Sequence, residues 1–385
     1  MLEKAFSGTK RYWVLISILF LFVVVGLFCF IYQLRFGLSL TNLSRDVPWG
    51  FYISQFTYFV GIAAAGVVVV LPFYIHNYKD FGRITILGEF MAVASVTMAM
   101  LFIFISMGKP SRVFNVIIYA TPHSIIFWDF FVLMTYLFLN LIIGWVVLQS
   151  DKNEIKPPRW AKVLIFISIP WAPLIHIITA FLYSGLPGKE YWLSAIMAPR
   201  FLVSAFASGT SLLILLSLVI KHFTNFNPGE RSVLLLKTIV TYALLINLFF
   251  FACELFTVFY SQIPDHMEHF RYLYLGIDGH NRMVPYMWTS ILLMVLAIPL
   301  LLLPVFKKST FSLIIACIFI IVGTWIDKGI GLITGGFIPN SFGDINEYWP
   351  TYFELLLSLG IYAFGFLILT ILYKIAITVR EEIEL

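Results

Sequence analysis

Three ionisable side chains, those of Asp129, His176 and Glu254, interrupt long runs of hydrocarbon residues. A charge held in hydrocarbon costs about 3 kcal/mol even by lenient measures, so such residues normally face a cavity or a partner. Imidazole changes charge near neutral pH, and carboxylates and imidazoles are the common proton-transfer groups of proteins. These residue types therefore indicate binding or proton transfer inside a membrane.

Other ionisable residues lie at the same ends of neighbouring hydrophobic runs. Arg200 precedes Ser204 at the start of one run, Asp327 and Lys328 are adjacent near the end of another, and Glu354 begins a third. Long charged side chains can also extend from a helix end to the membrane surface. The sequence leaves both interpretations open: an outer polar cluster, or simple anchoring at the interface.

The polar residues repeat at helical spacing. Positions separated by seven, or by four and seven, share one face of a helix with 3.6 residues per turn. Four such stripes are present: Asp129, Tyr136 and Asn140; Asn247, Glu254 and Ser261; His176, Thr179 and Tyr183; and Ser204, Ser208 and Ser211. We therefore expect several helices to present polar faces to a common interior.

Glu89 is the one carboxylate placed well away from the outer group, near the inner end of its hydrophobic run. A proton pathway from Glu89 toward Asp129 would need relay groups, for which Tyr136, Asn140, Asn247 and Glu254 are the candidates. An alternative interpretation pairs Glu89 with Arg83 at the membrane boundary. The sequence does not choose between a pathway and an ion pair.

The composition places these residues in a membrane. The 385 residues are 61% hydrophobic and 12% charged, with a mean hydropathy of +0.94, values that exclude an ordinary soluble globule. Runs long enough to cross about 30 Å of hydrocarbon predict an all-α polytopic membrane protein, a single integral membrane domain spanning 1–385. Its ten predicted helices cover 12–34, 52–76, 83–107, 123–149, 160–184, 199–222, 232–260, 285–305, 310–332 and 350–376.

The distribution of basic residues predicts the orientation. Sixteen of the 25 Lys and Arg residues fall on the side of the two termini, and positive loops face the cytoplasm. We expect a multi-pass protein of the cytoplasmic membrane with both termini inside, so the net charge of +5 reflects orientation and anionic lipid and does not indicate nucleic-acid binding. The outer segments 261–284 and 333–349 are long and aromatic, as expected of a docking face.

The cysteines do not predict a metal centre. Cys29, Cys253 and Cys317 are isolated in three different predicted helices, and none forms a CxxC spacing. Iron–sulfur and zinc sites require clustered cysteine or histidine ligands. We therefore expect no metal in this chain, and any iron–sulfur chemistry would belong to a partner.

Four segments resemble one family of membrane subunits. They are "DVPWGFYISQFTYFVGIAAAG", "TPHSIIFWDFFVLMTYLFLN", "HIITAFLYSGLPGKEYWLSAIMAPRFLVSAFASG" and "GTWIDKGIGLITGGFIP", which are similar to the NrfD-like quinone-interacting subunits over nearly the whole chain. The ten-helix length resembles the longer branch, which includes HybB and the DsrP subunit of the DsrMKJOP complex of sulfur metabolism, and DsrP is the more similar.

This resemblance implies a fold and a function. The fold is two four-helix bundles, formed by predicted helices 2–5 (52–184) and 6–9 (199–332) and flanked by the first and tenth. The function is electron exchange between menaquinone or another quinone, bound near the outer face, and a ferredoxin-like iron–sulfur subunit on the extracytoplasmic side. Further membrane and cytochrome subunits are implied as partners, with proton translocation as a linked activity and no haem or iron–sulfur cluster in this chain.

Quinone chemistry assigns roles to the outer residues. A quinol releases two electrons and two protons, so its site needs hydrogen-bonding groups and a titratable acceptor. We expect His176 to take the proton role, oriented by Asp129. Aromatic walls and polar contacts would come from the quinone-binding candidates Trp49, Tyr52, Tyr58, Arg200 and Ser204. "FYISQFTYF" stands where shorter family members carry an Asn and a His, so head-group contacts cannot be transferred directly.

Two other classes remain possible at this point. An ion or solute transporter could also have ten helices with buried charges, although here the polar residues gather toward one face and not at the midplane. A haem-b cytochrome would need two histidines at matched depth on facing helices. His123 and His176 are the near candidates, and about eight residues of depth separate them.

Overall fold

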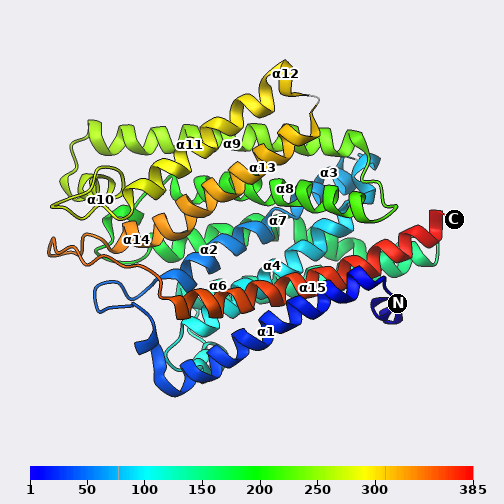
Figure 1. Ribbon diagram of the computed structural model, residues 1–385, viewed down its shortest axis with the longest axis horizontal. Helices are drawn as coiled ribbons and strands as arrows, with labels where there is room; N and C mark the ends of the chain where they lie inside the picture. The colour runs from blue at the N-terminus through cyan, green and yellow to red at the C-terminus, as the bar shows by residue number, and fades with distance from the viewer. Residues whose placement is uncertain (77, 308, 385) are drawn as a thin grey trace.

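The computed structural model describes residues 1–76, 78–307 and 309–384, and within them the chain is entirely helical apart from loops and one isolated bridge. Ten helices in these ranges are long and apolar enough to cross a membrane. The predicted all-α polytopic class is therefore confirmed. Figure 1 shows the long helices running roughly side by side, with both termini at the same end of the molecule.

The spanning elements follow the predicted order, with boundaries shifted by up to three residues, except that the ninth and tenth spans end five and eight residues later than predicted. Single helices form eight of the spans: α1 (Lys10–Phe36), α4 (Thr85–Ser106), α6 (Ile125–Lys152), α7 (Arg159–Ser184), α8 (Met197–Phe223), α9 (Glu230–Tyr260), α11 (Val284–Leu302) and α15 (Tyr352–Glu384). Two spans are interrupted: α2 (Phe51–Ala64) with α3 (Val67–Ile75), and α13 (Thr310–Trp325) with the π-helical η6 (Ile326–Gly331) and α14 (Leu332–Phe337).

Short helices lie before the first span and in the connections. They are η1 (Leu2–Phe6), η2 (Gly37–Leu40), η3 (Lys79–Arg83), η4 (Pro110–Phe114), α5 (Asn115–Ile118), η5 (Glu190–Trp192), α10 (Pro264–Tyr274) and α12 (Pro304–Lys307). The longest of them is α10, which folds within the predicted docking segment 261–284. Its residues contact α9, α11, α14 and η5, so this segment is an ordered layer over one end of the helices.

The helices pack as two groups of four. In bundle one, α2 packs against α4, α4 against α6, α6 against α7, and α7 returns to α2 and α3. In bundle two, α8 packs against α9, α9 against α11, α11 against α13, and α13 returns to α8. The bundles meet where α2 crosses α8, and the small residues Ala65 and Gly209 allow this approach, because a methyl group at position 209 would lie 2.3 Å from the Ala65 Cβ.

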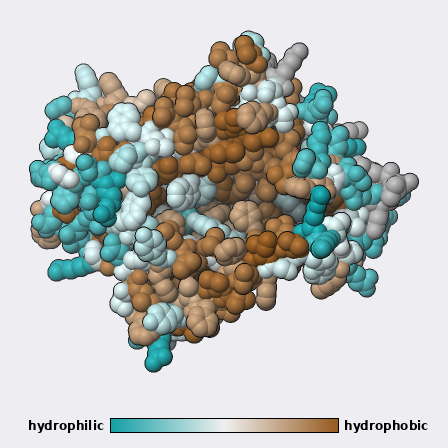
Figure 2. Space-filling model, viewed as in Figure 1, coloured by the Kyte–Doolittle hydropathy of each residue, from teal (hydrophilic) through white to brown (hydrophobic). Residues whose placement is uncertain are grey.

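The first and last spans lie outside both bundles. Helix α15 packs against α4 and α6 of bundle one, and α1 packs mainly against α15. Gly26 and Gly360 form the α1–α15 crossing, since a Cβ added at Gly26 would lie 2.6 Å from the Gly360 Cα. Most of the outward surface of α1 is exposed hydrocarbon, such as Phe28 at 75%. Figure 2 shows the resulting apolar belt between two hydrophilic ends, as a bilayer requires.

Candidate functional site

The most concentrated group of buried charges lies where the two bundles meet, and η6 positions it. Asp327 and Lys328 are consecutive, yet both are buried, with exposures of 8% and 5%. A π-helical turn departs from ordinary helical spacing and is frequently found at functional sites. The two side chains take different partners: Asp327 contacts Arg200, and Lys328 contacts His176.

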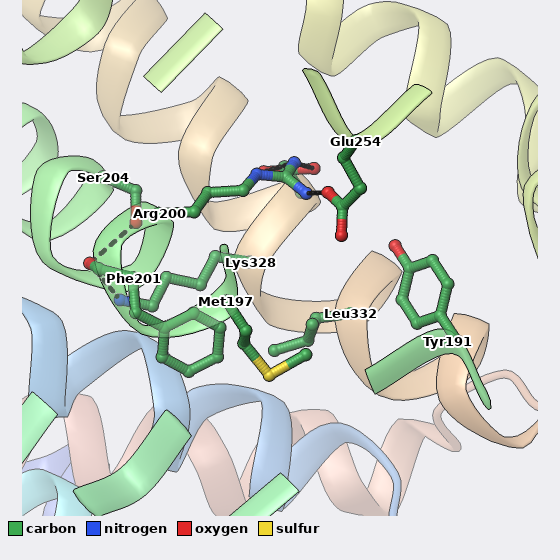
Figure 3. Close-up of a pocket in the computed structure, with 9 residues that line it drawn as sticks. Tyr191, Met197, Arg200, Phe201, Ser204, Glu254, Lys328 and Leu332 are labelled. Carbon is green, nitrogen blue, oxygen red and sulfur yellow. Dashed lines mark hydrogen bonds and ion pairs between the residues drawn. The ribbon is translucent and has the colours of Figure 1, made fainter. Parts of the chain in front are cut away.

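Arg200 joins two carboxylates inside bundle two. Its guanidinium donates to Glu254 from α9 and to both carboxylate oxygens of Asp327, at 2.8 and 2.9 Å. The Arg200 side chain is only 13% exposed and the two carboxylates 9% each. Figure 3 shows Arg200 extending from α8 toward Glu254. We call these three residues the arginine triad; their burial excludes simple anchoring at the membrane surface.

Lys328 connects the two bundles. Its ammonium group contacts the Nε2 atom of His176, on α7 of bundle one, and donates to the Phe201 carbonyl of α8 at 3.0 Å. The Nζ atom also lies 4.5 Å from the centre of the Phe201 ring. Gly61 on α2 leaves the necessary space, because a methyl group there would lie 3.1 Å from Nζ and 3.3 Å from the His176 ring.

Asp129 occupies a different part of the site from the one predicted. The Thr179 hydroxyl donates to Asp129 at 2.7 Å, and the expected Asp129–His176 pair is not formed. His176 is fully buried, and its Nδ1 atom has no hydrogen-bonding partner among the residues that the structure describes. Lys328 occupies Nε2 from the side of bundle two, a contact that sequence spacing within bundle one cannot reveal.

Aromatic rings cover this site on the side of the loops that precede α2 and α8. Trp49 stacks on Trp192 with 6.0 Å between ring centres, and Tyr183 contacts both rings. The Tyr183 hydroxyl also contacts Thr57 on α2. Trp192 is completely buried, and its indole N–H donates to the Leu332 carbonyl at 2.9 Å. The aromatic cover therefore links both bundles above His176.

The predicted quinone-binding residues do not surround a single cavity. The Tyr52 hydroxyl points to α1 and donates to Gln33 at 3.0 Å, whereas the Tyr58 hydroxyl points to α13 and donates to the Ile321 carbonyl at 3.1 Å. Trp49 belongs to the aromatic cover, and Arg200 and Ser204 line a cavity in bundle two. The hydroxyls of Tyr52 and Tyr58 are thus engaged by α1 and α13 and not by His176, which the sequence alone does not show.

That cavity is small. It is bordered by the arginine triad together with Tyr191, Met197, Phe201, Ser204, Lys328 and Leu332, and its volume is about 20 Å³. A space of about 10–15 Å³ is the minimum for one water molecule. The cavity can therefore hold a water next to Lys328, Glu254 and Asp327, but not a quinone ring.

Glu89, near the start of α4, is deeply buried. Its exposure is 2%, and neither carboxylate oxygen has a hydrogen bond to any of the described residues. The alternative pairing with Arg83 is not formed; Arg83 instead donates to the Asn227 carbonyl at 3.4 Å. Gly144 of α6 faces Glu89, since a methyl group at 144 would lie 3.4 Å from its Oε2 atom.

The candidate relay residues divide between the bundles. Asn140 lies one turn of α6 from Gly144, and its amide donates to the Tyr136 carbonyl at 2.8 Å, so both residues lie between Glu89 and Asp129. Asn247 lies on α9 in bundle two, where its amide contacts Met294 at 3.7 Å. Glu254 belongs to the arginine triad. The predicted track therefore keeps Tyr136 and Asn140 but not Asn247 or Glu254, because α9 does not face α6.

Two polar residues gained roles that the sequence did not indicate. Glu354 accepts hydrogen bonds from Tyr348 at 2.5 Å and from the Thr351 backbone N–H at 2.9 Å, so it fixes the start of α15 and lies apart from the site. The Gln55 carbonyl accepts from Trp325 at 2.7 Å and Tyr362 at 2.6 Å, and its amide nitrogen has no partner within the described ranges. The one sequence feature that could have drawn attention to Gln55 is its position as a polar residue within the aromatic segment "FYISQFTYF".

The histidines His123 and His176 do not form a haem site. His123 lies exposed in the loop before α6, whereas His176 is buried with Lys328 at Nε2. Two axial ligands would have to face one another at one depth, and this pair does not.

The fold and site define a multi-pass membrane protein of two four-helix bundles with a buried charge cluster at their junction. Comparison with protein families identifies the particular family: residues 39–339 match the model described as "Polysulphide reductase, NrfD". The chain belongs to the NrfD family, because the match covers most of its length and includes every residue of the candidate site.

Individual relatives agree with this assignment. A chain of Halobacterium salinarum, provisionally named as a membrane subunit of dimethyl sulfoxide reductase, is 25% identical over 95% of this chain and 91% of its own. A selenate reductase subunit of Mesobacillus selenatarsenatis is 25% identical over 97% and 96%. An Hdr-like menaquinol oxidoreductase integral membrane subunit of Archaeoglobus fulgidus is 30% identical over 55% of this chain and 52% of its own.

Proposed function

We propose that this chain is the membrane subunit of a redox complex, in which it binds a quinone or quinol, such as menaquinone, near the outer face. It exchanges electrons with the iron–sulfur centre of an extracytoplasmic partner subunit and has no redox metal of its own. Support comes from relatives named as subunits of reductases and of a menaquinol oxidoreductase. DsrP-like sulfur metabolism is one setting for such a complex.

The observation that carries this proposal is His176. It is fully buried at the junction of the bundles, lies beneath the aromatic cover, and has one ring nitrogen, Nδ1, without a partner in the described part of the chain. A quinone oxygen requires a donor and a quinol hydroxyl requires an acceptor, and imidazole can serve as either. Asp129, held by Thr179, supplies a second proton acceptor in the same bundle.

Quinone access requires side chains to move, because the cavity beside the site, at about 20 Å³, has room for a water molecule only. We propose that Trp49, Tyr183 and Phe201 separate to admit the head group next to His176. Tyr183 contacts Trp49 by edge packing at 5.8 Å and Phe201 by tilted packing at 6.0 Å. Rearrangements of this kind at binding sites are common among proteins that order around a ligand.

We propose that the electron-accepting partner docks over α10 and the loop 338–351. The excess of Lys and Arg on the side of the termini supports an orientation in the cell membrane with that side in the cytoplasm. The opposite end then faces outward, and α10 together with this loop forms its ordered surface. A partner docked there is close to the aromatic cover, which is next to His176.

The test uses the complete complex purified from membranes. His176→Gln keeps a hydrogen-bonding side chain but cannot carry an added proton, so quinol-dependent reduction of the partner's iron–sulfur centre should fall about 100-fold, while the subunits still copurify. The matched control is His76→Gln at the opposite end of the molecule, which should retain parental activity. Unchanged turnover in an assembled His176→Gln complex would remove His176 from the reaction.

A further inference from the structure

The contact between Lys328 and His176 gives the site a second function, because the proton between Nζ and Nε2 can belong either to Lys328 or to His176. Neutral imidazole carries hydrogen on one ring nitrogen and accepts at the other. If Lys328 is an ammonium, Nε2 accepts its proton and Nδ1 carries hydrogen. If Lys328 is an uncharged amine, Nε2–H can donate to it, and Nδ1 becomes the acceptor.

The surroundings of Lys328 support both states. Its partners among the described residues are His176 and the Phe201 carbonyl, with the Phe201 ring 4.5 Å away; the Asp327 carboxylate is engaged by Arg200. The carbonyl and the ring stabilise the ammonium. No carboxylate hydrogen-bonds directly to Nζ within the described ranges, so no ion pair fixes the charged form.

A path for the proton away from Lys328 is present in bundle two. The cavity of about 20 Å³ is lined by Lys328 and by Glu254 and Asp327, and its volume fits a bridging water. Figure 3 shows Glu254 and Lys328 on the border of this space. Lys328 therefore contacts His176 directly. On its other side it shares the cavity with Glu254 and Asp327, the carboxylates of the arginine triad.

We propose that Lys328 sets the tautomer of His176 and receives, through that ring, one of the two protons released by each quinol. The inference rests on the proposed function and deepens it. With Lys328 as an amine, Nδ1 accepts a quinol O–H proton while Nε2–H passes its own to Nζ. The two electrons go to the partner's iron–sulfur centres, the second proton leaves separately, and Nδ1–H then faces a quinone oxygen. Lys328 finally transfers its proton through water to Glu254 or Asp327.

This mechanism links the charge of Lys328 to the redox form that binds. A charged Lys328 favours quinone, because Nδ1–H is a donor, and an uncharged Lys328 favours quinol, because Nδ1 is an acceptor. A side chain that cannot lose its charge should therefore bind quinone and disfavour quinol. Arginine is such a side chain, since it stays protonated in proteins.

The experiment compares Lys328→Arg with the parent in the purified complex, using a water-soluble menaquinone analogue in its oxidised and reduced forms. The ratio of quinol to quinone dissociation constants should rise about tenfold or more in Lys328→Arg, and quinol oxidation should fall about 100-fold. Thr210→Val, a buried change on α8 outside the site, is the matched control and should keep the parental ratio.

A second variant covers the possibility that arginine does not fit beside Gly61. Lys328→Met leaves His176 free to adopt either tautomer, so both forms of the analogue should bind as in the parent, but turnover should still fall about 100-fold. Parental turnover in an assembled Lys328→Met complex, or a parental affinity ratio in an assembled Lys328→Arg complex, overturns the inference. If the parent itself binds neither form, the proposed function fails, and this inference fails with it.

Discussion

The buried carboxylates of bundle one, Asp129 and Glu89, have no cationic hydrogen-bonding partner within the described residues, whereas Glu254 and Asp327 of bundle two share the guanidinium of Arg200. The two bundles thus stabilise buried carboxylates in different ways. Bundle two compensates charge with charge, which fixes its geometry. Bundle one leaves its carboxylates to be satisfied by protons or water, which suits groups that gain and lose protons.

Removing the cation of the arginine triad should have the largest effect. Arg200→Met leaves Glu254 and Asp327 buried without compensation, and breaking a buried ion pair in this way costs about 3–5 kcal/mol. We expect the protein to accumulate poorly and to lose its folded form at a markedly lower temperature, measured by size-exclusion chromatography of heated, detergent-purified samples.

Two controls test whether charge is the cause. Restoring neutrality with Arg200→Met, Glu254→Gln and Asp327→Asn together should recover most of the lost stability. Asp129→Asn in bundle one should lower the midpoint temperature of unfolding far less than Arg200→Met does. Equal losses in Arg200→Met and Asp129→Asn would show that the two bundles do not differ in the proposed way.

The flanking helices should affect bundle one selectively. Gly26→Leu inserts a side chain where a Cβ already lies 2.6 Å from the Gly360 Cα, so α1 must move away from α15. Overpacking of this kind costs about 1–3 kcal/mol. Because α15 packs on α4 and α6, hydrogen exchange should increase in those helices and remain unchanged in α9.

The lipid-facing substitution Phe28→Ala on the same helix serves as the control and should leave exchange unchanged. Increased exchange in both bundles after Gly26→Leu would indicate that α1 and α15 support the whole molecule and not bundle one alone.

Glu89→Gln should alter function more than stability. The carboxylate has no hydrogen-bonding partner to lose among the described residues, so we expect a change in stability within about 1 kcal/mol. If Glu89 begins an inner proton route through Asn140 and Tyr136, charge moves across part of the membrane during turnover. The variant should keep quinol oxidation in detergent but lose the dependence of turnover on membrane potential in liposomes.

Parent and variant responding alike to an imposed potential would exclude the inner route. If neither responds, the protons of quinol are exchanged on the outer side alone, and the Glu89 carboxylate of bundle one serves another purpose.

The smallest expected effect concerns the outer layer over bundle two. The His269 ring contacts the Ile338 carbonyl at 3.1 Å through Nδ1, and burial, with positive charge from His266 and Lys189, lowers its pKa below 6.5. The unfolded segment then binds more protons below pH 6.5, so folding of α10 onto the loop 338–351 weakens as the pH falls through that value. Protease cleavage of this loop should increase a few-fold from about pH 7.5 to about pH 5.5.

His269→Gln retains a donor for the Ile338 carbonyl but does not titrate in this range. Its cleavage rate should therefore be nearly independent of pH. An equally strong acid response in the variant would assign the effect to other groups, such as the His266–Glu190 pair at 3.5 Å.

The spans were predictable because crossing a bilayer demands long apolar runs, a signal carried by each segment separately. The interruptions were not. No feature of the sequence "WIDKGIG" distinguishes the π-helical turn at Ile326–Gly331 from a regular helix, and the turn is seen only in the folded chain, where it packs against α2 and α11. That turn accounts for the largest difference at the site, since it buries Lys328 that the sequence allowed to reach the surface.

The candidate site was predictable by residue type and depth. Asp129, His176, Arg200 and Glu254 stand out because charges are rare in hydrocarbon. Their partners depend on which helices pack against one another. Helical periodicity assigns a residue to one face of its own helix, but it does not identify the helix that packs against that face. This is why Asn247 was placed on the track of Tyr136 and Asn140, although α9 and α6 lie in different bundles.

The sequence by itself determined that this protein crosses the membrane ten times and that its buried ionisable groups lie mostly toward one face, because hydropathy and charge act residue by residue. Only the tertiary structure decided how those groups pair: Thr179 with Asp129, Lys328 with His176, and Arg200 with two carboxylates. Pairing is a property of atoms within about 3 Å of each other, and here those atoms come from helices far apart in the chain.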